Sequence, residues 1–218
     1  MKSVEIKKYI AEMIGTFTLV FCGTGAIIIN EQTAGEVSSF GIAVTFGLIV
    51  MAMIYSIGNI SGAHINPAVT IAFAVSKKFP KKQVIPYIAF QLAGALFASI
   101  ILKFLFPENV MLGATNPHGT AMQSFILEII LTFFLMFVIL CVSSGSNEKG
   151  LMAGIAIGGF VLLAAAFAGP ISGASMNPAR SLAPALVSGQ LESLWIYLLA
   201  PIIGAILALV GYNAIKSD

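Results

Sequence analysis

The sequence predicts an all-α membrane protein with six transmembrane helices and two shorter half-helices that enter the membrane without crossing it. The first observation is composition: of 218 residues, 58% are hydrophobic and 9% are charged, whereas charged residues make up about 25% of a soluble domain. The second is six apolar runs of transmembrane length, and the third is two shorter runs that begin with Asn-Pro. This composition excludes a soluble globular protein, and a net charge of +2 argues against nucleic-acid binding.

The six long apolar runs are the predicted membrane spans. A helix needs about 20 apolar residues to cross the hydrocarbon core, and the segments between the runs hold nearly all of the charges. The first run is interpreted as a retained helix because no small-residue cleavage site follows it. Residues 1–218 are therefore expected to form one transmembrane domain. The predicted spans are 9–29, 38–58, 84–106, 122–142, 151–169 and 193–214.

Two apolar stretches, 66–75 and 177–187, are too short to cross a bilayer. Each opens with Asn-Pro, and Asn is a favoured N-cap while Pro is favoured at the first helical position. Irregular backbone at membrane depth is tolerated only where it is buried in protein or lines a wet cavity. We therefore expect two re-entrant half-helices, each preceded by an unwound segment, 61–65 and 172–176.

The lysines predict the orientation of the chain. In a six-span arrangement one side holds only Lys103, at a helix end, together with Glu31, Glu36, Glu108 and Glu192. Because lysines are concentrated in cytoplasmic loops, both termini are expected to be cytoplasmic, in a cytoplasmic (inner) membrane. The lysines on the other side are Lys2, Lys7, Lys8, Lys77, Lys78, Lys81, Lys82, Lys149 and Lys216.

The two halves of the chain repeat one another. The segment from Ile60 to Ala68 reads ISGAHINPA and reappears from Ile171 as ISGASMNPA, and Glu12 recurs upstream as Glu128. Because three is an odd number of spans, the second copy of a three-span unit enters the membrane from the opposite side. We therefore expect inverted repeats at about 6–106 and 120–215, whose half-helices meet near the middle of the bilayer.

The expected meeting point has the chemistry of a neutral-solute pore. Two helix N-termini would place partial positive charge at one point, and the amides of Asn66 and Asn177 would add donors. Such a site suits the oxygen of water or an alcohol and opposes cations. The central constriction is predicted to comprise Asn66, Pro67, Ala68, Asn177, Pro178 and Ala179, and the unwound backbone lining the pore Gly62, Ala63, His64, Ile65, Gly173, Ser175 and Met176.

Three charged residues fall at membrane depth. Arg180 follows the second Asn-Pro-Ala where Val69 follows the first, and because a buried charge is costly there we interpret it as part of a selectivity constriction. Glu12 and Glu128 are expected to brace the unwound loops by accepting hydrogen bonds; the alternative is a proton relay. His64 either lines the inner vestibule or responds to pH.

These motifs resemble the aquaporin, or major intrinsic protein, family, with the nodulin-like branch similar over 167–184. The resemblance implies a homotetramer within the lipid, with one pore per subunit, which Gly154-x-x-x-Gly158 supports as a small-residue pattern. It also implies an outer filter at Phe46, Ala165, Ala174 and Arg180. Water-selective members usually carry His at the position of Ala165, and glycerol facilitators usually carry Asp where this chain has Ser181.

The resulting expectation is a passive channel for water and small uncharged solutes such as glycerol, excluding ions and protons. We expect no enzyme activity, cofactor or metal, and no nucleic-acid partner. Alternatives are a strictly water-selective channel, an ion- or proton-coupled transporter that uses Glu12 or Glu128, and a structural or adhesive membrane protein. Cys22 and Cys141 lie in apolar segments without metal-ligand spacing.

Overall fold

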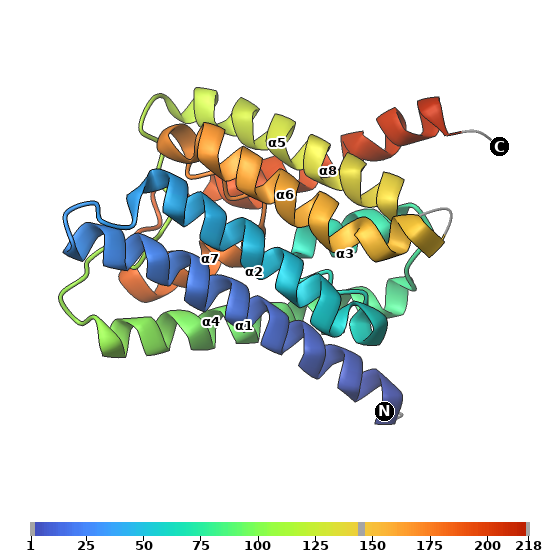
Figure 1. The fold of residues 1–218 in the computed structure, drawn as a ribbon, viewed down its shortest axis with the longest axis horizontal. Helices are drawn as coiled ribbons and strands as arrows, with labels where there is room; N and C mark the ends of the chain where they lie inside the picture. The colour runs from blue at the N-terminus through green and yellow to red at the C-terminus, as the bar shows by residue number, and fades with distance from the viewer. Residues whose placement is uncertain (1–2, 144–146, 217–218) are drawn as a thin grey trace.

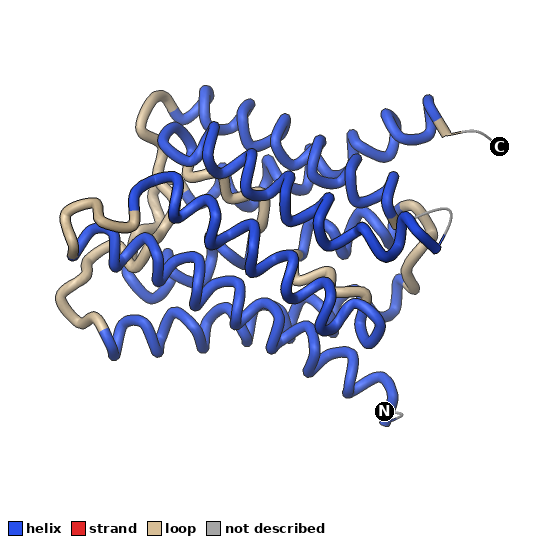
Figure 2. The backbone as a smooth tube through the Cα atoms, viewed as in Figure 1, coloured by secondary structure: helices blue, strands red, loops and turns tan. Residues whose placement is uncertain are grey.

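The computed structural model describes the backbone of residues 3–143 and 147–216, and the regular structure in these residues is entirely helical (Figures 1 and 2). This confirms the all-α architecture predicted from composition and apolar run length. Besides a short 3₁₀ turn, η1 (Lys81–Gln83), the elements are α1 (Ser3–Gln32), α2 (Ser38–Ser61), α3 (Pro67–Val75), α4 (Val84–Leu105), α5 (Ala121–Val142), α6 (Asn147–Ser172), α7 (Pro178–Ser188) and α8 (Leu194–Ile215).

Six helices of the described chain are long and apolar enough to cross a membrane: α1, α2, α4, α5, α6 and α8. The helices α3 and α7 contain 9 and 11 residues, which at about 1.5 Å per residue is about half of a bilayer core or less. Apolar side chains such as Phe104 (83% exposed) and Val210 (68% exposed) cover the outside of the bundle. The chain is therefore an integral, multi-pass membrane protein.

The helices extend beyond several predicted boundaries. α1 is longer at both ends than 9–29, and α6 continues through Pro170 to Ser172. The prediction that Ser61 and Ser172 belong to unwound segments was wrong, because each is the last helical residue before the loop. Their hydroxyl oxygens accept hydrogen bonds from the loop backbone, at Ala63 and Ala174, so a serine is useful at this helix end.

Close helix contacts at glycines hold the bundle together. A Cβ atom on Gly94 would collide with the backbone of Met13 where α4 crosses α1, and one on Gly204 would collide with the backbone of Ile129 where α8 crosses α5. Backbones that approach this closely gain van der Waals contact along their length. The pair α1 and α4 in the first half of the chain and the pair α5 and α8 in the second half are thus both in close contact at a glycine.

The helices α2 and α6 meet at a third close contact. A Cβ on Gly47 would lie 2.7 Å from the carbonyl oxygen of Gly158, and one on Gly154 would lie 2.6 Å from the Tyr55 ring. Gly154 and Gly158 therefore face α2 of the same chain. Their interpretation as a pattern for subunit contact was wrong, because the space that they leave is filled within the monomer.

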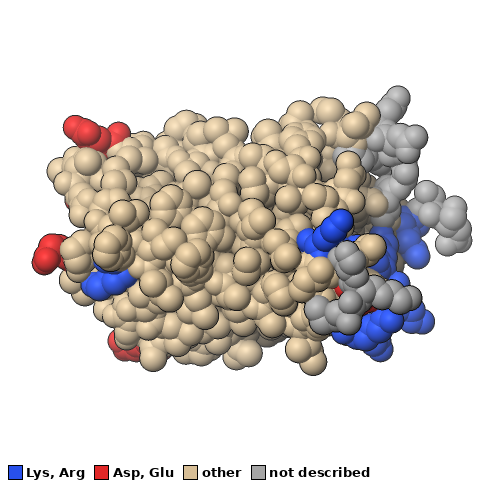
Figure 3. All heavy atoms as spheres, turned by 90° about the horizontal axis from the view of Figure 1, so that it is seen from below, with Lys and Arg blue, Asp and Glu red and all other residues tan. Residues whose placement is uncertain are grey.

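Charged side chains gather at the two ends of the molecule. In Figure 1 both termini lie at one end, and Figure 3 shows most of the Lys and Arg side chains at that end and acidic side chains at the other. Lys103 lies at the acidic end, where its ammonium donates to the carbonyl of Pro107 at 2.8 Å. Lys2 lies outside the described residues, as does the side chain of Lys149.

Candidate functional site

The half-helices α3 and α7 begin at their Asn-Pro pairs. Asn66 is the N-cap of α3, and its side-chain oxygen accepts from the Ala68 N–H at 2.9 Å. Asn177 caps α7 in the same way, accepting from Ala179 at 3.0 Å. The sequence forms these helix starts because the Asn oxygen satisfies a backbone donor and Pro67 or Pro178 has no N–H to leave unpaired.

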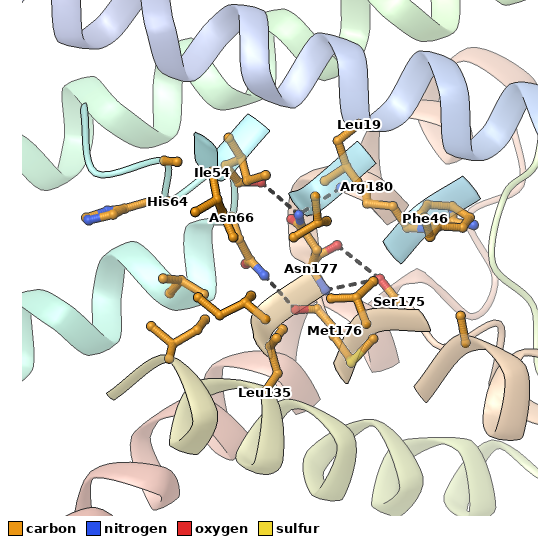
Figure 4. Close-up of a pocket in the computed structure, with 18 of the residues that line it drawn as sticks. Leu19, Phe46, Ile54, His64, Asn66, Leu135, Ser175, Met176, Asn177 and Arg180 are labelled. Atoms are coloured by element: carbon orange, nitrogen blue, oxygen red, sulfur yellow. Dashed lines mark hydrogen bonds between the residues drawn. The ribbon is translucent and has the colours of Figure 1, made fainter. Parts of the chain in front are cut away.

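The second end of each Asn amide crosses to the other loop. Asn66 Nδ2 donates to the carbonyl of Met176 at 2.8 Å, and Asn177 Nδ2 donates to the carbonyl of Ile65 at 2.8 Å (Figure 4). An amide nitrogen has two N–H groups, so one of them ties the loops together and one per Asn is left for another acceptor. Sequence reasoning assigned these donors wholly to a passing solute and missed the cross-link.

The two unwound loops repeat the same unusual backbone. Gly62 ends α2 with φ +92°, and Ala63 and Ile65 follow with φ of +48° and +42°. The second loop repeats this at Gly173, Ala174 and Met176, with φ of +82°, +41° and +52°. Positive φ is unfavourable for residues with a Cβ, so both loops need bonds from outside to keep this shape.

Glu12 supplies such bonds to the first loop. Its Oε1 accepts from the Ser61 hydroxyl at 2.7 Å and the His64 N–H at 2.9 Å, and its Oε2 accepts from the Ile65 N–H and from Gln91, both at 2.7 Å. The side chain is completely buried. A carboxylate with both oxygens occupied by donors satisfies backbone groups that would otherwise be unpaired at membrane depth.

Glu128 does the same for the second loop. Its Oε1 accepts from the Ser172 hydroxyl and the Ser175 N–H, and its Oε2 accepts from the Met176 N–H, all at 2.8 Å. It too is completely buried. The two acidic residues thus occupy equivalent places in the two repeats.

Sequence reasoning missed three further residues that hold these loops. The hydroxyl of Tyr87 donates to the Ser61 carbonyl at 2.8 Å, and that of Tyr197 donates to the Ser172 carbonyl at 2.7 Å. Each tyrosine lies seven residues before the glycine of its helix crossing, a repeated spacing that could have revealed the pair. Gln91 has no such signal, because the second repeat has Pro201 in its place.

Two cavities meet beside α7. The inner cavity, of about 110 Å³, runs past both Asn residues, and the outer cavity, of about 460 Å³, is bordered by Glu31 and His118. Three residues line both: Phe46, Ala165 and Arg180. They therefore surround the junction between the two spaces.

Arg180 is fixed at this junction. It is 2% exposed, its Nη1 donates to the carbonyl of Gly113 at 2.8 Å, and its guanidinium carbon lies 5.1 Å from the centre of the Phe46 ring. Its Nε has no hydrogen-bond partner within the described part of the chain. Figure 4 shows His64, Asn66, Asn177, Arg180 and Phe46 following one another along the cavity.

Most of the predicted site residues line the inner cavity, but not all do. Gly173 lines the outer cavity instead, and neither cavity lining includes Pro67, Ala68, Pro178, Ala179, Glu12 or Glu128. The predicted residues that line the inner cavity are Phe46, Gly62, Ala63, His64, Ile65, Asn66, Ala165, Ala174, Ser175, Met176, Asn177 and Arg180.

Apolar side chains form a wall along much of the inner cavity, and its individual residues were not identified from the sequence. Apart from the residue on α1, they form pairs four positions apart on one helix, which is the spacing of one helical face, and this was the signal available in the sequence. The inner cavity thus combines the donors and carbonyls of the two loops with hydrocarbon from α1, α2, α3, α5 and α6. The wall contains Leu19, Val50, Ile54, Val69, Phe73, Leu135, Ile139, Ile157 and Val161.

Comparisons with known proteins agree with this geometry. Residues 1–212 match the family profile described as "Major intrinsic protein". Aquaporin NIP1-1 of Zea mays is 47% identical over 97% of this chain and 75% of its own length, and Nodulin-26 of Glycine max is 47% identical over 97% and 78%. The X-ray structure of the aquaglyceroporin from Plasmodium falciparum superposes with a TM-score of 0.87 at 27% identity, covering 97% of this chain and 96% of that one. The chain therefore belongs to the major intrinsic protein family, as the resemblance of its motifs implied.

Proposed function

We propose that this protein is a passive channel for water and small uncharged solutes such as glycerol, and that it excludes ions and protons. The observation that carries the proposal is the pair of cavities that share Phe46, Ala165 and Arg180 in their linings. The aquaporin relatives and the structural similarity to an aquaglyceroporin support the same class of function. Transport of this kind requires no catalytic step, so we assign no enzyme activity.

The junction is proposed as the selectivity filter, with Ala174 beside it on the inner side. Ala165 and Ala174 leave space opposite the bulky Phe46 and Arg180. A molecule such as glycerol has a carbon backbone on one side and hydroxyls on the other, so it matches an apolar wall that faces donors. Its hydroxyls would meet Arg180 and its carbons Phe46.

Cation exclusion would follow from charge concentrated along the same path. The N-termini of α3 and α7 and the guanidinium of Arg180 all present positive potential to the cavity. Each central Asn has one N–H left for the oxygen of a passing solute. A cation would lose hydration at this point and gain no compensating anionic ligand.

Two other functions are supported less well. A strictly water-selective channel would need a narrower junction than Ala165 and Ala174 provide. A coupled transporter would need a titrating carboxylate in the path, but Glu12 and Glu128 are fully buried and do not line the inner cavity. Their oxygens are instead occupied by loop donors.

We further propose that the two repeats are inverted, that the chain forms a homotetramer within the lipid, and that both termini are cytoplasmic in an inner membrane. The matching contacts of Glu12 and Glu128 support the first. The apolar outer surface is compatible with both lipid and neighbouring subunits. The lysines at the end that holds the termini support the orientation.

Stopped-flow light scattering on proteoliposomes tests the function. We expect osmotic water flux and glycerol re-entry that are both faster than in empty liposomes, and a glycerol rate that does not change when a pH gradient is imposed. Glycerol entry at the empty-liposome rate with fast water would favour the water-selective alternative. Glycerol flux that follows the pH gradient would favour the transporter.

A further inference from the structure

Gly23 in α1 lies directly against the ring of Phe46. A Cβ atom built on Gly23 would overlap the edge of that ring, with its nearest atoms Cε1, Cζ and Cδ1 all inside ordinary contact distance. Two residues further along the same helix, a Cβ on Gly25 would meet only Leu102, at an ordinary 3.5 Å. Of these two glycines, only Gly23 therefore lies where a side chain would displace the Phe46 ring.

The α2 backbone beside Phe46 cannot retreat from α1. At the next residue, a Cβ on Gly47 would lie 2.5 Å from the Cβ of Leu162, so α2 is already in close contact with α6. Atoms at the ring edge are the far end of a flexible side chain, whereas the helix contact involves backbone. A methyl group at position 23 would therefore move the ring and not the helix.

The open side of the Phe46 ring is the channel. Phe46 is 8% exposed and contributes to the lining of both cavities, with the Arg180 guanidinium carbon 5.1 Å from the centre of its ring. Since carbon atoms prefer separations of about 3.5–4.0 Å, relieving the overlap requires a ring shift on the order of 1 Å. A ring displaced from α1 would move into the junction that it lines together with Ala165 and Arg180.

We propose that Gly23 is a positioning residue for the filter: by having no side chain, it lets the Phe46 ring lie against α1 and so sets the width of the junction. This inference rests on the proposed function, because it takes the junction as the narrowest part of the solute path. Gly23 itself does not line either cavity, and it would act on the solute only through Phe46. The junction of this width would admit small polyols, which are wider than water.

The test compares Gly23→Ala with the matched control Gly25→Ala in proteoliposomes. We expect Gly23→Ala to lower glycerol permeability about tenfold, as a methyl-sized change in a fitted pocket does, and to lower water permeability less than twofold. Gly25→Ala should keep both wild-type rates. Ala is a better helix former than Gly, and Gly23→Ser supplies a second variant with a Cβ if the alanine variant is poorly expressed.

A double variant separates ring displacement from a general change in helix packing. In a Phe46→Val background, adding Gly23→Ala should leave the glycerol to water ratio unchanged, because no ring remains to be displaced. An unchanged ratio in Gly23→Ala alone would overturn the inference, and so would an effect that persists without the ring.

The same experiment distinguishes the inference from the proposed function. A wild-type protein that passes water but not glycerol would contradict the proposed function. The water permeability of Gly23→Ala would then test the ring position by itself, with a fall expected and an unchanged rate overturning it.

Discussion

The two half-helix loops share one framework and differ in the residues placed around it. Both have an Asn cap, a buried glutamate behind the loop and a tyrosine bound to the preceding serine carbonyl. The first loop packs His64 against the Phe79 ring, with ring centres 4.8 Å apart. Beyond the loops, α7 carries Arg180 where α3 has Val69. The shared residues support the two loops, and the residues that differ give the two ends of the inner cavity different side chains.

Hydrogen bonding around the two half-helices shows the same division. In the first repeat, Gln91 links Glu12 to Thr70, and Thr70 lies 3.1 Å from the His64 ring nitrogen. In the second, a chain of hydroxyls joins Ser175, Ser181 and Thr115, at 2.6 and 2.8 Å. These hydrogen bonds attach the segment between α4 and α5, which contains Thr115, to α7 beside Arg180. The supporting contacts are thus matched in the two halves of the chain, whereas Arg180 is present in only one.

Removing either Glu12 or Glu128 should have the largest effect on the stability of the folded protein. Glu12→Ala and Glu128→Ala each leave two loop N–H groups unpaired, at about 1–3 kcal/mol apiece. We expect little folded protein, measured by thermal unfolding of purified protein in detergent, with Glu36→Ala on the exposed surface as the control. Unfolding temperatures like that of the control in both variants would mean that the loops do not depend on these carboxylates.

Replacing Arg180 of α7 with the residue type found in α3 should weaken the exclusion of protons and other cations. Arg180→Val supplies the residue type of Val69 and removes the guanidinium from the junction, along with its bond to Gly113. We expect proton leak to rise by about tenfold, since a fixed charge in the pore is a main barrier to cations. A pH-sensitive dye inside proteoliposomes measures this. Wild-type leak in the variant would remove Arg180 from the filter.

Adding bulk to the junction should change selectivity more than conduction. Ala165→His should lower glycerol flux about tenfold and water flux much less, because the larger solute needs the space that Ala165 leaves. Phe167→His, at a 63% exposed position of the same helix, is the control. An equal fall in both fluxes would show that Ala165 lies elsewhere on the path than we propose.

The smallest effect is expected in the hydroxyl chain of the second repeat. Ser181→Ala removes bonds to Thr115 and Ser175, and each such bond contributes about 1 kcal/mol. We expect unfolding a few degrees below the wild-type temperature, with the channel still conducting. A loss as large as that of Glu128→Ala would show that this chain belongs to the frame.

Much of the fold could be predicted from the sequence because the membrane limits the choices. Apolar run length gives the spans, and Asn-Pro gives the starts of α3 and α7. Boundaries were less predictable: Ser61 and Ser172 are helical because tertiary partners, Glu12 and Glu128, hold them there. Such bonds join residues far apart in sequence and leave no local pattern.

The candidate site was only partly visible in the sequence. The motif residues and Arg180 were found from the repeat and from charge at membrane depth, and Phe46 and Ala165 through family resemblance. The crossed bonds of Asn66 and Asn177 could not be predicted, since they depend on the distance between two loops. Gly23 was invisible for the same reason, because its importance lies in the ring that it touches.

We propose that this channel recognises its solute at the junction of Phe46, Ala165 and Arg180. An experimental structure of the protein with glycerol in the membrane would test it most directly. We predict glycerol bound at the junction, with its hydroxyls on Arg180 and its carbons against Phe46. Glycerol ordered elsewhere in the channel, with the junction occupied by water alone, would contradict the claim.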